Sequence, residues 1–143
     1  MKIILNALLI ASTLLVSTVA HAGTENWVMI GQSDPRGENP AKIYVDTYSR
    51  SPMNNHTYLI IQRSDYRFPQ PAPTGGLQYT SMYVLKRVSC DQRMFAAAKI
   101  IEANGDQVVY DSGAPSMQEP LHAVTLGSIG ASLIDVTCGT TKD

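Results

Sequence analysis

The stretch YTSMYVLKRVSCDQRMFAAAKIIEANGDQVVYD (residues 79–111) has the clearest strand pattern in the chain. Its first part, Tyr79 to Cys90, is the longest strand candidate, and its side chains alternate between two faces. A second candidate, Arg93 to Ile101, follows after two residues, so Asp91-Gln92 is predicted to lie at or near a hairpin turn. These segments predict two neighbouring antiparallel strands.

Segments on both sides extend this predicted sheet. Downstream, Asn104-Gly105 is a strong turn dipeptide, and Gln107 to Tyr110 supplies a returning strand. Upstream, apolar or alternating runs predict three more strands, Trp27 to Ile30, Lys42 to Thr47 and His56 to Ser64. Polar breaks such as Ser49 to Asn55 separate them. Asp65 to Gln78 carries three prolines and a Gly-Gly pair, so it is predicted to be an irregular loop.

The last segment changes to a helical period. Its apolar positions recur at helical spacing, at Leu126, Ile129, Leu133 and Thr137, with Ile134 and Cys138 beside them. Ser128 is predicted to be a first-turn helix residue, and Gly139 is predicted to end the helix. The helix would lie on the sheet face that includes Cys90. The sequence therefore predicts an α+β fold, a mainly antiparallel, meandering sheet of about six strands with a C-terminal α-helix packed on one face.

The first residues have the pattern of an export signal. Lys2 precedes an apolar run from Ile3 to Val16, and Ala20-His21-Ala22 forms a small-x-small cleavage site. We expect a signal peptide at residues 1–22, cleaved after Ala22, and one exported domain at 23–143, in the periplasm, at the cell surface or secreted. The alternative is a membrane anchor, but the run is shorter than the ~20 residues that span a bilayer, so no transmembrane segment is predicted. No cysteine follows the cleavage site, so no lipoprotein anchor is expected.

The predicted export changes the interpretation of the two cysteines. In an oxidising compartment, Cys90 and Cys138 are expected to pair and to tie the helix to the strand. A disulfide that closes the span between Cys90 and Cys138 would stabilise the fold by about 4 kcal/mol on the chain-entropy model. Reduced, reactive or metal-binding cysteines are the alternative, which no Cys-x-x-Cys spacing or nearby histidine supports.

Composition and motifs argue against several function classes. With 11 basic and 12 acidic residues the net charge is -1, so nucleic acid is not an expected partner. His56 and His122 lack further ligands at metal-binding spacing, and no cofactor motif is present. Residues 127–130 lack the G-x-S-x-G spacing of a nucleophile elbow, and the carboxylates are scattered. We therefore expect no catalytic residues, metal or cofactor; hydrolysis stays an alternative that nothing supports.

Tyrosine is the feature of the composition that stands out. The chain has seven tyrosines against two phenylalanines and one tryptophan. Tyrosine suits interaction surfaces because it buries a large area and keeps a polar tip. The uncovered sheet face is the first candidate partner-binding surface, with Tyr79, Tyr83, Leu85 and Arg87. The predicted loop is the second, with Tyr66 and Phe68. The alternative is that tyrosine simply favours strands.

The order of several short motifs resembles a known family. They are Asn26-Trp27-Val28-Met29-Ile30-Gly31, Ile43-Tyr44-Val45-Asp46, Ser89-Cys90-Asp91, Val108-Val109-Tyr110-Asp111-Ser112, Gly127-Ser128-Ile129-Gly130 and Val136-Thr137-Cys138-Gly139. This succession is similar to the bacterial surface-adhesin protein E-like domain family and covers nearly the whole predicted mature chain. The resemblance implies a small antiparallel sheet with a C-terminal helix tethered by a disulfide.

The resemblance also implies a function. The founding member is a surface adhesin for host matrix and serum proteins such as laminin and vitronectin, and it is dimeric. It is a lipoprotein, whereas this chain has no lipobox cysteine. We therefore expect an exported, non-enzymatic binding protein with a protein partner, and a homodimer is one expected assembly. The alternative is a periplasmic or envelope accessory protein that binds a bacterial protein or a small ligand.

Overall fold

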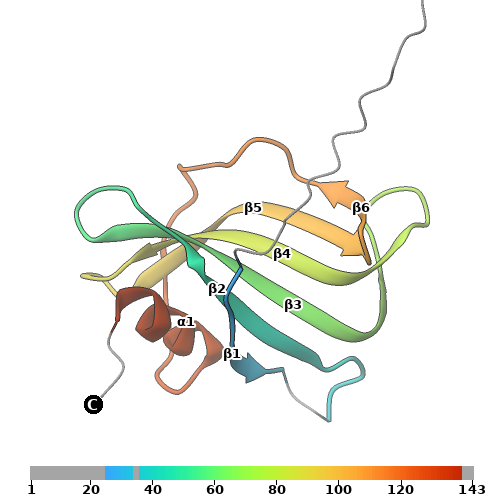
Figure 1. The fold of residues 1–143 in the computed structure, drawn as a ribbon, viewed down its shortest axis with the longest axis horizontal. Coiled ribbons are helices and arrows are strands. Elements are labelled where there is room, and N and C mark those ends of the chain that lie inside the picture. The colour runs from blue at the N-terminus through green and yellow to red at the C-terminus, as the bar shows by residue number, and fades with distance from the viewer. Residues whose placement is uncertain (1–24, 34–35, 140–143) are drawn as a thin grey trace, which may run out of the picture.

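The computed structural model describes residues 25–33 and 36–139, and the predicted signal peptide lies outside them. The described residues form seven strands and one helix: β1 (Trp27–Gln32), β2 (Ala41–Pro52), β3 (Thr57–Pro71), β4 (Gln78–Ser89), β5 (Met94–Asn104), β6 (Gln107–Asp111), β7 (His122–Ala123) and α1 (Ile129–Cys138). Strands β1 to β6 neighbour one another in sequence order, and each pair is antiparallel. The predicted α+β fold with a meandering sheet is confirmed (Figure 1).

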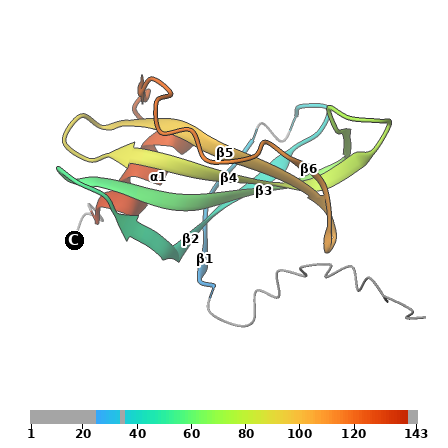
Figure 2. The same ribbon diagram turned by 90° about the horizontal axis from the view of Figure 1, so that it is seen from above.

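The helix covers one face of the sheet (Figure 2). The buried core beneath it joins Val45, Ile60 and Val88 from three strands to Leu133 and Ile134 of α1. Full burial of such side chains contributes about 1.5–3 kcal/mol each. Helical spacing brings Leu133, Ile134 and Thr137 to this face, and all three are fully buried. The predicted position of the helix on the sheet is confirmed.

Both ends of α1 are capped by local sequence. Ser128 is the N-cap, and its hydroxyl accepts a hydrogen bond of 3.2 Å from the Ala131 amide. The sequence predicts Ser128 in the first turn of the helix, and the structure places it immediately before that turn, where its extended backbone serves the cap. Gly139 has a φ of 75°, and its amide donates to the Asp135 carbonyl at 3.0 Å. It ends the helix as predicted.

The disulfide predicted between Cys90 and Cys138 is present. It joins the residue after β4 to the last residue of α1, with 5.7 Å between the two Cα atoms. The helix is therefore covalently tied to the strand at its C-terminal end. At its N-terminal end, a Cβ atom on Gly130 would lie 2.9 Å from the Phe95 ring, so only glycine permits this approach.

The strand β3 is longer than predicted. The irregular loop expected over Asp65 to Gln78 is wrong in its first half, because β3 continues to Pro71. A bulge follows Asp65, and pairing with β4 resumes with Gln70 opposite Tyr79. Prolines are tolerated beside bulges and at strand ends, where no ladder donor is needed. The connection is reduced to 72–77, in which Ala72 donates to the Leu77 carbonyl at 2.9 Å.

Two further boundaries differ from the prediction. The break expected over Ser49 to Asn55 is much shorter, because β2 passes a bulge after Asp46 and runs to Pro52. The sequence does not predict the two-residue strand β7, which pairs with β5 at Met94 and Phe95. Within the described part of the chain, α1 lacks the length and apolar character of a membrane-crossing helix.

Candidate functional site

The face of the sheet opposite α1 carries an aromatic cluster. In register, Tyr44 of β2 lies opposite Arg63 of β3, and Arg63 lies opposite Tyr83 of β4. Side chains of directly opposed residues share a face, so these three point away from the helix-covered core. Trp27 of β1 joins them through its ring contact with Tyr83. We call Trp27, Tyr44, Arg63 and Tyr83 the aromatic cluster.

Arg63 lies at the centre of the aromatic cluster. Its guanidinium carbon is 4.5 Å from the Trp27 ring centre and 4.9 Å from the Tyr44 ring centre. The Trp27 and Tyr83 rings meet edge to face with centroids 6.2 Å apart. Such cation–π and aromatic contacts contribute about 0.5–2 kcal/mol each and hold the side chains in fixed positions. The cluster is therefore a preorganised surface.

Hydrogen bonds position the margins of the aromatic cluster. Arg63 forms an ion pair of 3.2 Å with Asp65, whose other oxygen accepts from the Ser81 hydroxyl at 2.9 Å. The Trp27 indole donates to Glu25 at 2.8 Å. Among the described residues, the buried Arg63 Nε has no hydrogen-bond partner. The arginine is held by rings and by one carboxylate, and its side chain keeps 23% of its surface exposed.

The residues predicted for the first candidate surface have different positions. Tyr83 belongs to the aromatic cluster, and Leu85 lies two residues further along the same face of β4. Arg87 lies on this face too, but its guanidinium donates to the carbonyls of Met117 and Glu119. It anchors the segment that follows β6 along β5 (Figure 1). Arg87 therefore has a structural contact that occupies it.

Tyr79 and the two residues of the second candidate surface lie at the far end of β3 and β4. The Tyr66 and Tyr79 rings meet edge to face at 5.6 Å. Burial raises the pKa of both hydroxyls, and the nearby Glu102 carboxylate adds to the effect. Phe68 is exposed, with the Arg67 guanidinium 5.3 Å from its ring centre. The ring contacts of these residues are with each other and with Arg67.

The sequence does not identify Trp27, Tyr44 and Arg63 as members of a site. The alternation in Lys42 to Thr47 already placed Tyr44 away from Ile43 and Val45. What the sequence lacked was the register that sets Tyr44 beside Arg63, since strand pairing depends on contacts between distant segments.

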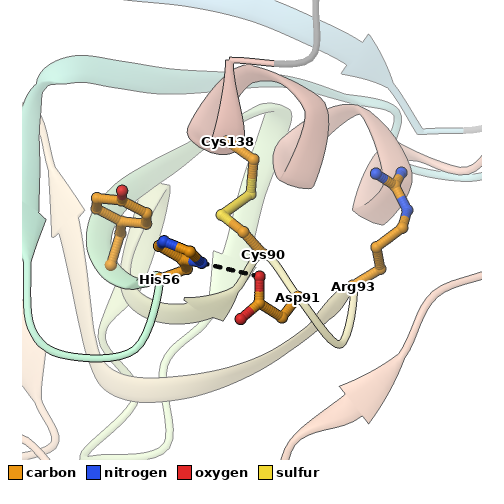
Figure 3. Close-up of a pocket in the computed structure, with 6 residues that line it drawn as sticks. His56, Cys90, Asp91, Arg93 and Cys138 are labelled. Carbon is orange, nitrogen blue, oxygen red and sulfur yellow. Dashed lines mark hydrogen bonds and ion pairs between the residues drawn. A yellow bond between two sulfur atoms is a disulfide. The ribbon is translucent and has the colours of Figure 1, made fainter.

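A pocket of about 360 Å³ lies at the end of the sheet opposite to Tyr66 and Tyr79, where two hairpin turns meet the end of α1. Figure 3 shows both cysteines of the disulfide in its lining, with His56 and Asp91 facing each other. His56 Nδ1 lies 3.0 Å from Asp91 Oδ1. Tyr58 and Arg93 complete the lining. Arg93 forms an ion pair of 2.8 Å with Asp135 of α1.

Two ionisable side chains lie on the helix face of the sheet. Lys86 is directly opposite Ile60, and burial lowers its pKa to about 8. Its ammonium lies 4.1 Å from the centre of the Phe95 ring. Burial also raises the pKa of Glu102, whose Oε2 is buried without a partner among the described residues. In both cases burial disfavours the charged form relative to that of an exposed side chain.

Lys86→Met is expected to stabilise the protein at pH 7 by about 1–2 kcal/mol. The folded-state pKa lies below the ordinary value of 10.5, so charged Lys86 costs up to about 3 kcal/mol, part of which the Phe95 ring offsets. The wild-type stability therefore rises between pH 8 and 10.5, and the gain from the substitution shrinks over that range. Urea denaturation of wild type and Lys86→Met at pH 7 and pH 9.5 measures the gain in stability and its decrease with pH. Lys42→Met, at an exposed β2 position, is the control, and equal stabilities of wild type and Lys86→Met at pH 7 would contradict the expectation.

No protein-family model, curated protein or solved structure matches the chain. The function is therefore inferred from the aromatic cluster and the pocket themselves.

Proposed function

We propose that the chain is an exported, non-enzymatic binding protein that resembles a bacterial surface adhesin. Its partner is a host matrix or serum protein such as laminin or vitronectin. The partner contacts the aromatic cluster. The observation that carries this proposal is the ordered aromatic cluster on the uncovered sheet face, in which Arg63 contacts the rings of Trp27 and Tyr44, and Tyr83 contacts Trp27.

The chemistry of the aromatic cluster fits a protein interface. Tryptophan, tyrosine and arginine are the side chains that most often dominate binding energy. Here their mutual contacts already fix their rotamers, so binding loses little side-chain entropy. Met29 lies beside Tyr44 in register and is 48% exposed, which extends the surface with an adaptable apolar side chain.

An accessory protein of the periplasm or envelope is the second candidate. It would use the same aromatic cluster to bind a bacterial protein, so the surface itself does not separate the two functions. Cell fractionation does, because a strictly periplasmic protein is out of reach of host matrix. Detection of the mature protein at the cell surface or in the medium supports the adhesin-like function.

Trp27→Ala and Tyr83→Ala are each expected to weaken binding to immobilised laminin or vitronectin by about 30-fold, which corresponds to about 2 kcal/mol for an aromatic hot spot. Each substitution removes a ring from the aromatic cluster and loosens Arg63. Solid-phase binding with purified variants measures the effect, and circular dichroism confirms that each variant is folded.

Tyr48→Ala is the matched control for these variants. Tyr48 lies on β2 with 71% of its surface exposed, and it makes none of the ring contacts of the aromatic cluster. We expect it to bind as the wild type does. Full binding by folded Trp27→Ala and Tyr83→Ala would remove the aromatic cluster as the contact surface.

A further inference from the structure

The pocket at the disulfide brings three chain segments together. His56 and Tyr58 come from the β2–β3 turn and β3, and Cys90 and Asp91 come from the β4–β5 turn. Cys138 is the end of α1. The pocket of about 360 Å³ opens onto solvent beside both sulfur-bearing residues, so a small thiol has room to approach them (Figure 3).

The imidazole of His56 is the acid or base that this pocket offers. Asp91 holds its Nδ1 at 3.0 Å, and the described residues provide no partner for the other ring nitrogen. The remaining charges around the pocket are engaged elsewhere. Arg93 pairs with Asp135 at 2.8 Å, and Arg50 donates to the Thr137 carbonyl at 2.7 Å while stacking on Tyr58.

The backbone conformation of the two turns beside the pocket indicates a functional role for the side chains that they carry. Asn55, His56 and Arg93 have positive φ angles of 44°, 53° and 51°. They are the non-glycine residues with this conformation in the described ranges, and all belong to the two turns that border the pocket. Glycine is favoured there, so His56 costs stability at its position. Strained residues that gather at a pocket are typical of functional sites.

The two sulfurs have different surroundings. Cys138 is the last residue of α1, where the negative end of the helix dipole disfavours a thiolate. Cys90 follows β4 beside the His56–Asp91 pair, where a protonated imidazole favours a thiolate and can donate a proton. Cleavage of the disulfide therefore favours Cys90 as the leaving group and Cys138 as the sulfur attacked.

We propose that the Cys90–Cys138 disulfide is a thiol–disulfide exchange site for a dithiol reductant. A thiolate of the dithiol attacks Cys138 Sγ, the sulfur–sulfur bond breaks, and its electron pair stays on Cys90 Sγ, which takes a proton from His56. The second thiolate of the dithiol then attacks the mixed disulfide and releases Cys138, which is protonated by solvent. The reductant leaves as a cyclic disulfide, and two electrons have passed to the protein. Asp91 is the positioning residue for His56.

The test is the rate at which dithiothreitol, the dithiol probe, reduces the folded full-length mature protein. Alkylation and mass spectrometry follow the free thiols between pH 5 and 8, the range in which histidine changes charge. Rates are divided by the concentration of dithiothreitol thiolate. We expect this normalised rate constant to rise as pH falls, and we expect His56→Gly to lower it by about tenfold and to flatten its pH profile.

His56→Gly separates chemistry from folding, because glycine is the residue that the turn prefers. Its thermal midpoint is expected to equal or exceed that of the wild type while exchange slows. Asp91→Asn is expected to shift the pH profile, and His122→Ala, at the exposed strand β7, is expected to leave it unchanged. An unchanged normalised rate and profile in His56→Gly would overturn the proposal. So would a wild-type rate independent of dithiothreitol concentration, because reduction would then require global unfolding.

Discussion

The double variant Cys90→Ala/Cys138→Ala is expected to lose about 4 kcal/mol of unfolding free energy. The disulfide closes a span of 48 residues that contains β5, β6, β7 and nearly all of α1. Removing the disulfide raises the conformational entropy of the unfolded chain. In the folded chain, the helix is then attached by packing and polar contacts alone. The free energy of unfolding of a native domain is about 5–15 kcal/mol, so the expected loss is a large fraction of its stability.

Urea denaturation of the double variant, monitored by circular dichroism, measures this loss. Wild type reduced under native conditions is the matched comparison, because it lacks the same cross-link but keeps both side chains. We expect the two to agree within about 1 kcal/mol, allowing for the small loss of sulfur packing. A double variant as stable as the oxidised wild type would show that α1 docks without help from the cross-link.

Leu133→Ala is expected to cost about 3–4 kcal/mol. Leu133 is fully buried where α1 meets Val45, Ile60 and Val88, so its loss opens a cavity at the centre of the core. The rigid cross-link at Cys138 and the tight approach at Gly130 limit how far the helix can shift to fill that cavity. The cost therefore lies above the lower end of the range of about 2–5 kcal/mol for leucine truncations.

Leu126→Ala is the matched control for this core variant. Leu126 precedes α1 and is 86% exposed, so the same atoms are removed without creating a cavity. We expect a change below about 0.5 kcal/mol in its free energy of unfolding. Equal losses in Leu126→Ala and Leu133→Ala would contradict the position of the core.

The sequence carries enough local information for most of the fold. Alternating residues in β4 and β5 and the short connection at Asp91-Gln92 predict the central hairpin, and the helical period predicts α1. The sequence predicts too short a β3, because prolines usually interrupt a strand. In the structure, the bulge after Asp65 allows the strand to continue through Pro69 to Pro71. Bulges arise from pairing between strands, so a single segment does not reveal them.

The candidate site was harder to predict than the fold. The sequence identified Tyr83 as a surface residue, but it did not reveal that Arg63 lies between the rings of Trp27 and Tyr44. That arrangement depends on the register across four strands. Arg87 looked equally available in the sequence, yet a segment 30 residues later accepts its hydrogen bonds. In both cases, long-range pairing determines which side chains are available to a partner.

The single tryptophan of the chain offers a direct test of the proposed binding surface. In ¹⁵N-labelled protein, the indole N–H of Trp27 gives one resonance from the centre of the aromatic cluster. Titration with unlabelled laminin or vitronectin is expected to shift or broaden this resonance earlier than the backbone signals of β6, which lies at the opposite edge of the sheet from β1. Complex formation that leaves the Trp27 indole resonance unchanged would contradict binding through the aromatic cluster.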